Sequence, residues 1–162
     1  AQTPAAQPTT PAPSAEAYYR QGQAAEKAGD PAAARKAYQD ALKLNPNHAN
    51  SRYAIGQLKL TADSISARGR EQKFGAVTVS EFKLADASLQ EALDALGVVV
   101  ERESKKSIAP NFVLQDPKNQ LASAKLNLNL KSMPAKAVLK YVLDQANAKA
   151  RFDEHAIVVV PK

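Results

Sequence analysis

The sequence of 162 residues contains no cysteine, no tryptophan and only two histidines. The absence of cysteine excludes disulfides, thiolate zinc sites and cysteine nucleophiles. His48 and His155 lie far apart in the sequence, and neither has a second ligand at the spacing typical of a metal site. We therefore expect two turn residues, no metal and no cofactor. No apolar run approaches the roughly 18 residues of a membrane-spanning helix, so no membrane span is predicted in this segment.

A concentrated charge of one sign is also missing, although the net charge is +6. The lysines and arginines are scattered among acids and form no basic stripe interleaved with aromatic residues. We therefore expect no nucleic-acid partner. A nucleic-acid-binding adaptor stays open as an alternative that salt-dependent binding would reveal.

The residue groups that carry catalysis are not visible either. The six glycines are dispersed and form no phosphate-binding loop. Asp153 and Glu154 are adjacent in a predicted hairpin turn, where neighbouring side chains point apart. Ser104 and Ser107 flank two lysines, but the accompanying motifs of a serine–lysine enzyme are lacking. The sequence therefore predicts a protein that is not an enzyme.

The N-terminal segment, residues 1–13, contains only alanine, glutamine, threonine and proline. Such a segment has little apolar surface to bury, so we predict a disordered, partly polyproline tether. The chain starts at Ala1 without an initiator methionine, as an exported protein does after its signal peptide is removed. This start favours an exported protein.

Residues 14–72 have the pattern of a helical unit. Ser14 is the expected N-cap of the first helix, which ends at Gly29. Asp30 caps the second helix, with Pro31 at its first position and Pro46 after its end. A third helix is expected from Ala49 to about Arg70. The short turns predict that the first two helices are antiparallel neighbours.

Gly22 and Gly56 are 34 residues apart, within "YYRQGQ" and "RYAIGQ". The segment that begins at Ala15 resembles a tetratricopeptide repeat, whose small and aromatic positions are occupied here by Tyr18, Gly22, Ala34, Tyr38, Ala41 and Pro46. Gln21 departs from the usual leucine. One full repeat is followed by the opening of a second. Because each repeat buries its face on the next, we expect these helices to pack against another domain or subunit.

Residues 76–162 combine strands and helices. "AVTVSEFKL" reads as a strand, with a bulge near Ser80 because the buried face changes there. Ser88 and Glu91 form a capping box ahead of a helix to about Lys105. "NFVLQ" and "LNLNL" are strands, and "SMP" interrupts before a second helix. "KARFD" and "AIVVV" form a hairpin. The fold class is α+β, with a βαββαββ order after the helices.

This part of the chain resembles the short N-terminal domain (STN) of secretins and TonB-dependent transducers. The resemblance covers a little over half of the chain. It rests on the segments "FKLADASLQEAL", "LNLNLKSMPAKAVLKYVL" and "RFDEHAIVVVP". It implies a periplasmic domain with two helices held between two small sheets.

In function, the resemblance implies the N-terminal part of a secretin-like outer-membrane channel of a type IV pilus or type II secretion system. Its partners would be other envelope, secretion or pilus assembly proteins, and the full-length protein would be a possible homo-oligomer. The alternatives are the signalling domain of a TonB-dependent transducer and a stand-alone tetratricopeptide adaptor.

Two surfaces are the candidate partner-binding sites. In tetratricopeptide repeats the first helix of each pair lines a groove, and the corresponding residues here are Glu16, Tyr19, Gln23, Glu26 and Tyr53. Tyrosine offers contact area at low entropic cost. The polar face of the "LNLNL" strand, with Asn127 and Asn129, is the second candidate.

Overall fold

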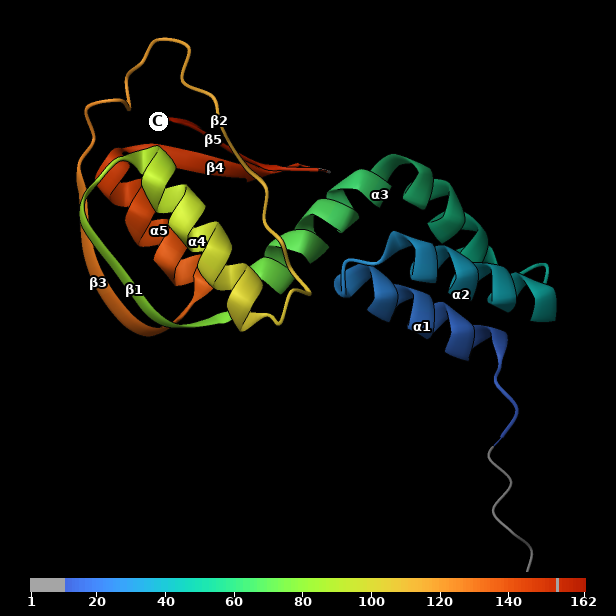
Figure 1. Ribbon diagram of the computed structural model, residues 1–162. Coiled ribbons are helices and arrows are strands. Elements are labelled where there is room, and N and C mark those ends of the chain that lie inside the picture. Colours follow the sequence, from blue (N-terminus) through green and yellow to red (C-terminus); the bar gives the residue numbers. More distant parts are fainter. Residues whose placement is uncertain (1–10, 154) are drawn as a thin grey trace, which may run out of the picture. The chain divides into compact units, whose positions relative to one another are not determined.

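The computed structural model describes residues 11–153 and 155–162 (Figure 1). The chain divides into two compact units, and the division falls between Ile65 and Ser66. Residues 1–10 of the predicted tether lie outside the described residues.

The elements follow one another as a helical part and then a part of mixed strands and helices, so the α+β class and the leading helical hairpin are confirmed. The helices of the first part are α1 (Ala15–Lys27), α2 (Pro31–Leu44) and α3 (Ala49–Gly75). The remaining elements are β1 (Thr78–Ala87), α4 (Leu89–Glu103), β2 (Phe112–Leu114), β3 (Leu126–Pro134), α5 (Ala135–Ala146), β4 (Ala148–Phe152) and β5 (Ile157–Pro161).

Local caps define the helical hairpin as predicted. The Ser14 hydroxyl accepts a hydrogen bond from the Ala17 N–H at 3.1 Å, and the Asp30 carboxylate accepts one from the Ala33 N–H at 2.9 Å. These bonds satisfy backbone donors that a helix N-terminus leaves without intrahelical partners. Pro31 occupies the start of α2, where its missing N–H costs nothing.

The first unit has a small core around one large aromatic residue. Tyr38 is 1% exposed and packs with Ala34, Leu58 and Ile65. Gly22 on α1 is also buried, directly against the Tyr38 ring. Small residues at these positions let α1 and α2 approach each other closely, as the repeat pattern predicts.

The expected end of the third helix near Arg70 is wrong, because α3 continues to Gly75. Apolar periodicity fades before that point, but Phe74 is buried at 3% exposure. Its ring lies 6.0 Å from that of Phe112 and 5.7 Å from that of Phe152. Burial of this one aromatic in the core of the second unit stabilises the last turns of the helix.

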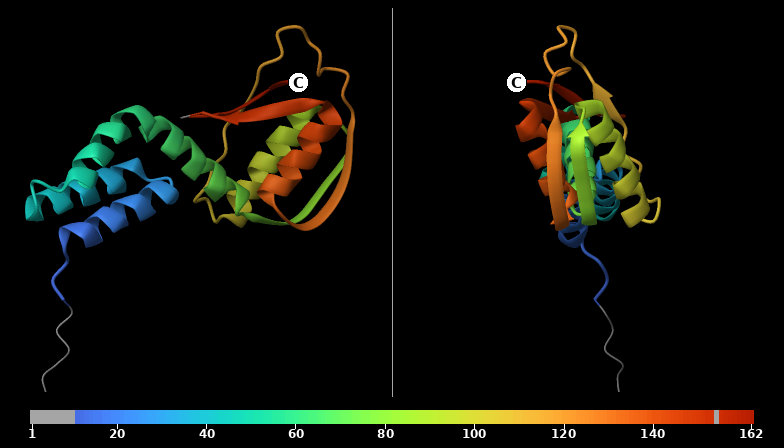
Figure 2. Two further views of the ribbon diagram at one scale, coloured as in Figure 1. Left: turned by 180° about the vertical axis from the view of Figure 1, so that it is seen from behind. Right: turned by 60° about the vertical axis from the view of Figure 1, so that its left-hand side comes forward.

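The second unit contains two small sheets with α4 and α5 between them (Figures 1 and 2). β1 and β3 form an antiparallel pair, and β2, β5 and β4 form a three-stranded sheet in that order. β5 is parallel to β2 and antiparallel to β4. The capping box of α4 is present, with reciprocal bonds between Ser88 and Glu91.

The bulge in β1 lies elsewhere than predicted. The pairing of β1 with β3 keeps one register across Ser80, and the shift occurs between Leu84 and Ala87. Asp86 there has a φ of 52°, and its N–H donates to the Asn127 Oδ1 at 2.9 Å. The change of buried face from Val79 to Phe82 is achieved without an extra residue, in two strands that curve around the helices (Figure 1).

The expected interruption at residues 132–134 is also wrong, because β3 continues through Pro134 and Met133 pairs with Val79. Ser132 accommodates the bend with a φ of 51°. Six described residues other than glycine have such positive φ values, and all of them lie in the second unit: Asp86, Lys105, Lys106, Asn119, Ser132 and Asn147.

Candidate functional site

Four predicted groove residues lie along one side of α1. Glu16, Tyr19, Gln23 and Glu26 follow one another at spacings of three or four residues, which places them on one helix face. The Tyr19 hydroxyl accepts a hydrogen bond from the Gln23 amide at 3.1 Å. The structure therefore brings this set, which we call the α1 face, together around Tyr19.

The ring of Tyr19 is held from two sides. Its centroid lies 5.7 Å from that of Tyr38 and 5.6 Å from the imidazole of His48. Tyr19 is half-buried, so part of the ring remains accessible. An aromatic side chain fixed by its neighbours loses little entropy on binding, which suits a contact residue.

His48 links the α1 face to the start of α3. Its Nε2 lies 3.2 Å from the Glu16 Oε2, and its Nδ1 lies 2.9 Å from the Ser51 Oγ. The Ser51 N–H also donates to Nδ1, at 3.3 Å. This arrangement fits the neutral tautomer with its proton on Nε2, which donates to Glu16.

The expectation that His48 is only a turn residue missed this network. The contact between His48 and Ser51 is local, but the contact with Glu16 spans 32 residues. The repeat pattern was the sequence signal that could have predicted the contact with Glu16. In such a repeat the residues after the second helix return toward the first helix of the same repeat.

Glu16, His48 and Ser51 are the residue types of a hydrolase triad. In a triad, however, a substrate can reach the serine hydroxyl, and here it cannot. Ser51 is fully buried, with no exposed surface. Its own backbone N–H also points at the nitrogen that would act as the base. A nucleophile must reach a substrate carbon, so we assign this series a structural role.

Tyr38 connects Glu26 to the core. Burial raises the pKa of the Tyr38 hydroxyl, and the negative charge of the nearby Glu26 carboxylate raises that pKa further. Glu26 therefore serves the α1–α2 packing as well as the α1 face.

Tyr53 stands apart from the other groove residues. It is 70% exposed on α3, and among the described residues it makes no ring contact or hydrogen bond with the α1 face. Leu60, seven positions later and so on the same side of the helix, is 80% exposed. These two side chains form an uncovered apolar pair on α3.

The two predicted asparagines of β3 differ in role. Asn127 is exposed, but its Oδ1 accepts the Asp86 N–H, and its backbone exchanges two hydrogen bonds with the Gln145 side chain. Asn129 is exposed and lies opposite Lys83. Asn127 therefore stabilises the bulge of β1, whereas partner contact by either residue stays a prediction.

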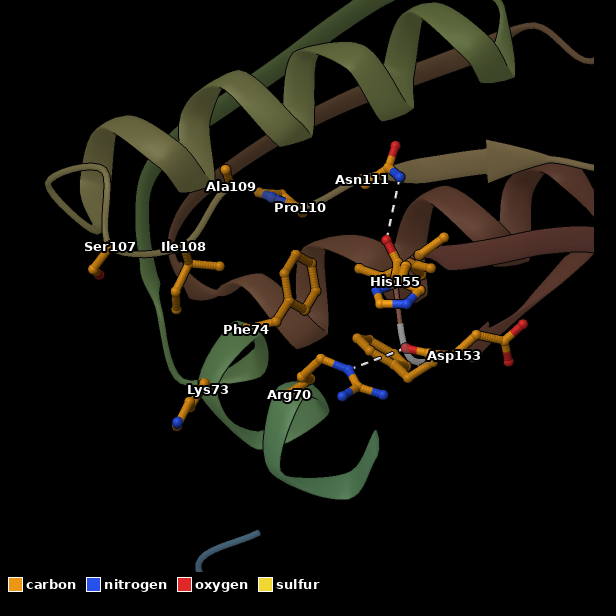
Figure 3. A pocket seen from close by; sticks show the side chains of 13 residues that line it. Arg70, Lys73, Phe74, Ser107, Ile108, Ala109, Pro110, Asn111, Asp153 and His155 are labelled. Carbon is orange, nitrogen blue, oxygen red and sulfur yellow. Dashed lines mark hydrogen bonds between the residues drawn. The ribbon is translucent and has the colours of Figure 1, made fainter. Parts of the chain in front are cut away.

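A cavity of about 260 Å³ in the second unit is lined by the end of α3 and the β4–β5 turn (Figure 3). The Arg70 Nε donates to the Asp153 carbonyl at 3.0 Å, and the Asn111 amide donates to the His155 carbonyl at 3.2 Å. Arg151 forms two bonds with the Asp153 carboxylate, and its guanidinium lowers the pKa of that group. These polar groups hold the turn in place.

Within the described ranges no group of three or more potential ligand side chains is arranged to hold a metal ion. No described helix is both long and apolar enough to cross a membrane.

Comparison with known proteins identifies one segment. Residues 15–48 match the family model of the tetratricopeptide repeat, which confirms the predicted repeat over α1, α2 and the turn that contains His48. Neither the curated proteins nor the solved structures contain a match to the chain. Tetratricopeptide repeats are typically non-catalytic interaction modules, so this segment indicates a protein-interaction module with protein partners.

Proposed function

We propose that the chain is a periplasmic protein–protein assembly module, the N-terminal part of a secretin-like outer-membrane channel of a type IV pilus or type II secretion system. The helical unit binds an assembly partner, and the second unit belongs to the envelope assembly itself. The observation that carries the binding function is the α1 face, an ordered aromatic and acidic surface inside a segment that matches a tetratricopeptide repeat.

The incomplete repeat supports a bound partner. α3 begins a second repeat, yet it leaves Tyr53 and Leu60 largely exposed. A helix or extended segment of a partner that covers this pair would bury apolar surface and stabilise the helical unit.

The arrangement of the second unit supports the envelope assignment. Its βαββαββ order, with two helices between a two-stranded and a three-stranded sheet, is what the STN resemblance leads us to expect. The periplasmic location and the channel rest on that resemblance.

Site-specific photo-crosslinking in cells that make the natural full-length protein tests the binding surface. A photoreactive amino acid at Gln23 or Tyr53 should crosslink to an envelope assembly protein, because these positions lie on the proposed surface. The same amino acid at Gln39, exposed on α2, is the matched control. Equal crosslinking at Gln39 would contradict a specific surface.

Location is tested with the same full-length protein. Because these 162 residues lack cysteine, Ser123→Cys introduces the one thiol of this part of the chain, in an exposed loop. A membrane-impermeant maleimide should label it once the outer membrane is permeabilised. The protein should also appear in the outer-membrane fraction as a heat-dissociable multimer. Labelling only after lysis of the inner membrane would refute the periplasmic proposal.

A further inference from the structure

A groove of about 780 Å³ in the second unit lies between α5, the end of α3 and β4. Its floor is apolar, with Phe74, Leu139, Leu143 and Phe152 among the lining residues. Leu139 and Leu143 face it from α5, one turn apart. The groove is separate from the α1 face, which belongs to the first unit.

One wall of this groove is a sheet edge. In the three-stranded sheet the order is β2, β5, β4, so β5 covers only one side of β4 within the described residues (Figure 1). An uncovered edge presents backbone N–H and C=O groups that can pair with another strand. β4 therefore offers a template beside an apolar floor.

The hydrogen bonds at both ends of the β4–β5 hairpin show which backbone groups of β4 point away from β5. The Asp153 N–H donates to the Ala156 carbonyl at 2.8 Å, and the Lys162 N–H donates to the Asn147 carbonyl at 3.1 Å. Odd-numbered residues of β4 thus bond to β5. In an antiparallel pair the alternate residues point their backbone groups the other way, so those of Ala150 and Phe152 face the free edge, whereas Ala148 at the start of β4 is only 1% exposed.

A strand added at this edge would extend the sheet over the groove. Alternate side chains of that strand would point toward α5 and contact Leu139, Leu143 and Phe74. The floor accepts apolar side chains, and the small Ala150 leaves room beside them. The added strand would therefore bury alternate apolar residues.

The rim of the groove is basic. Lys162 lies 3.7 Å from Asp144, which leaves Lys136, Lys140 and Lys149 beside a single further acid, Glu71. Those three lysines form no ion pair with any described residue. The outward side chains of a complementary strand would therefore carry negative charge.

We propose that β4 receives an extended segment of another polypeptide, with alternating apolar and acidic side chains, as a fourth strand of this sheet. A second copy of this chain fits less well, because pairing of two β4 strands would bring the basic rims of the two grooves together. Residues 1–13 fit less well too, because they carry no charge and their prolines lack the N–H donors that pairing requires.

The test uses the whole 162-residue chain and a short capped peptide of alternating valine and glutamate. Binding should protect the amides of Ala150 and Phe152 from hydrogen exchange, as read by NMR. A second peptide with the same side chains carries N-methyl groups on alternate amides, which prevents strand pairing. We expect it to bind about tenfold more weakly or worse, since several hydrogen bonds are lost. Equal binding of the two peptides would overturn the proposal.

Three protein variants separate the contribution of strand pairing from that of charge. Ala150→Pro removes an edge N–H without removing a bond to β5, so it should weaken binding about tenfold while the folded spectrum persists. Lys149→Glu should weaken binding severalfold, and Lys118→Glu, which is exposed and does not line the groove, should not.

The peptide variants keep the test valid if Ala150→Pro fails to fold, because they leave the protein unchanged. Exchange protection confined to residues outside β4 would overturn the proposal. A concentration-dependent dimer that protects the β4 amides without peptide would overturn it in favour of a second copy.

Discussion

Gly22 touches the ring of Tyr38 so closely that a Cβ on Gly22 would lie 2.3 Å from the Tyr38 Cε1. Two further ring carbons would lie within 2.7 Å. This contact joins α1 to α2 at the centre of the first unit, where Tyr38 is almost fully buried. The glycine is required by the approach of the two helices and not by its backbone conformation.

Gly22→Ala should therefore destabilise the helical unit. The added methyl group forces the buried ring or the helices to move, and overpacking of this kind costs about 1–3 kcal/mol in the free energy of unfolding. Tyrosine fluorescence during thermal unfolding measures the effect, because the chain lacks tryptophan and Tyr18, Tyr19, Tyr38 and Tyr53 all lie in this unit.

Gly56→Ala is the matched control, because Gly56 occupies the equivalent position 34 residues later. A Cβ there has nothing within 4 Å. Replacing a helical glycine by alanine in open space stabilises by roughly 0.5–1 kcal/mol. If the two substitutions shift the unfolding temperature in the same direction, the proposed role of Gly22 is wrong.

The stability of the helical unit should fall at alkaline pH because of Tyr38. Burial raises the pKa of its hydroxyl, and Glu26 raises it further, so the folded state holds this proton more tightly than the unfolded chain does. The resulting stabilisation is complete below the ordinary tyrosine pKa of about 10 and is lost as the pH rises through the folded pKa.

Urea unfolding followed by circular dichroism between about pH 8 and pH 11 measures this dependence. Tyr38→Phe should flatten the alkaline decrease, because phenylalanine has no proton to lose. Tyr53→Phe is the control, since Tyr53 is largely exposed, and it should leave the decrease unchanged. An unchanged decrease in Tyr38→Phe would assign the effect to another group.

Asn127→Ala should destabilise the second unit by about 0.5–1.5 kcal/mol, because it removes the acceptor of the Asp86 N–H at the bulge. Asn129→Ala should change stability by less than about 0.5 kcal/mol, since that side chain is exposed. Chemical denaturation of both variants provides the comparison. Equal effects would remove the structural distinction between the two asparagines.

His48→Ala should cost about 1–3 kcal/mol in the free energy of unfolding, because it leaves the fully buried Ser51 hydroxyl without its partner. Ser51→Ala in the same chain should restore part of the loss by removing the unsatisfied group. A double-mutant cycle measured by denaturation yields the coupling between the residues. If the effects of the two substitutions are strictly additive, the contact between His48 and Ser51 contributes nothing to the free energy of unfolding.

Local signals explain which parts of the fold were predictable. Ser14, Asp30 and Pro31 mark helix starts, and Ser88 with Glu91 marks another, because caps act within four residues. Features that depend on distant segments were not predictable. The last turns of α3 form because Phe74 packs against Phe112 and Phe152.

The bulge shows a different difficulty. A change of buried face near Ser80 is a sequence signal, but curvature of the strands accounts for it without an extra residue. The real bulge contains Asp86 in a left-handed conformation that glycine ordinarily adopts, so no glycine marks the position. The α1 face was predictable from helical spacing and the repeat, whereas its link to His48 required the fold.

The left-handed residues of the second unit affect the unfolded chain as well as the folded one. Lys105, Lys106 and Asn147 turn the backbone where glycine would do so without strain. A residue with a side chain has fewer conformations to lose on folding than glycine has, which offsets part of the strain. Glycine substitution at these turns would therefore relieve strain in the folded state and raise the conformational entropy of the unfolded chain. The second unit is a suitable system in which to compare these two contributions to stability.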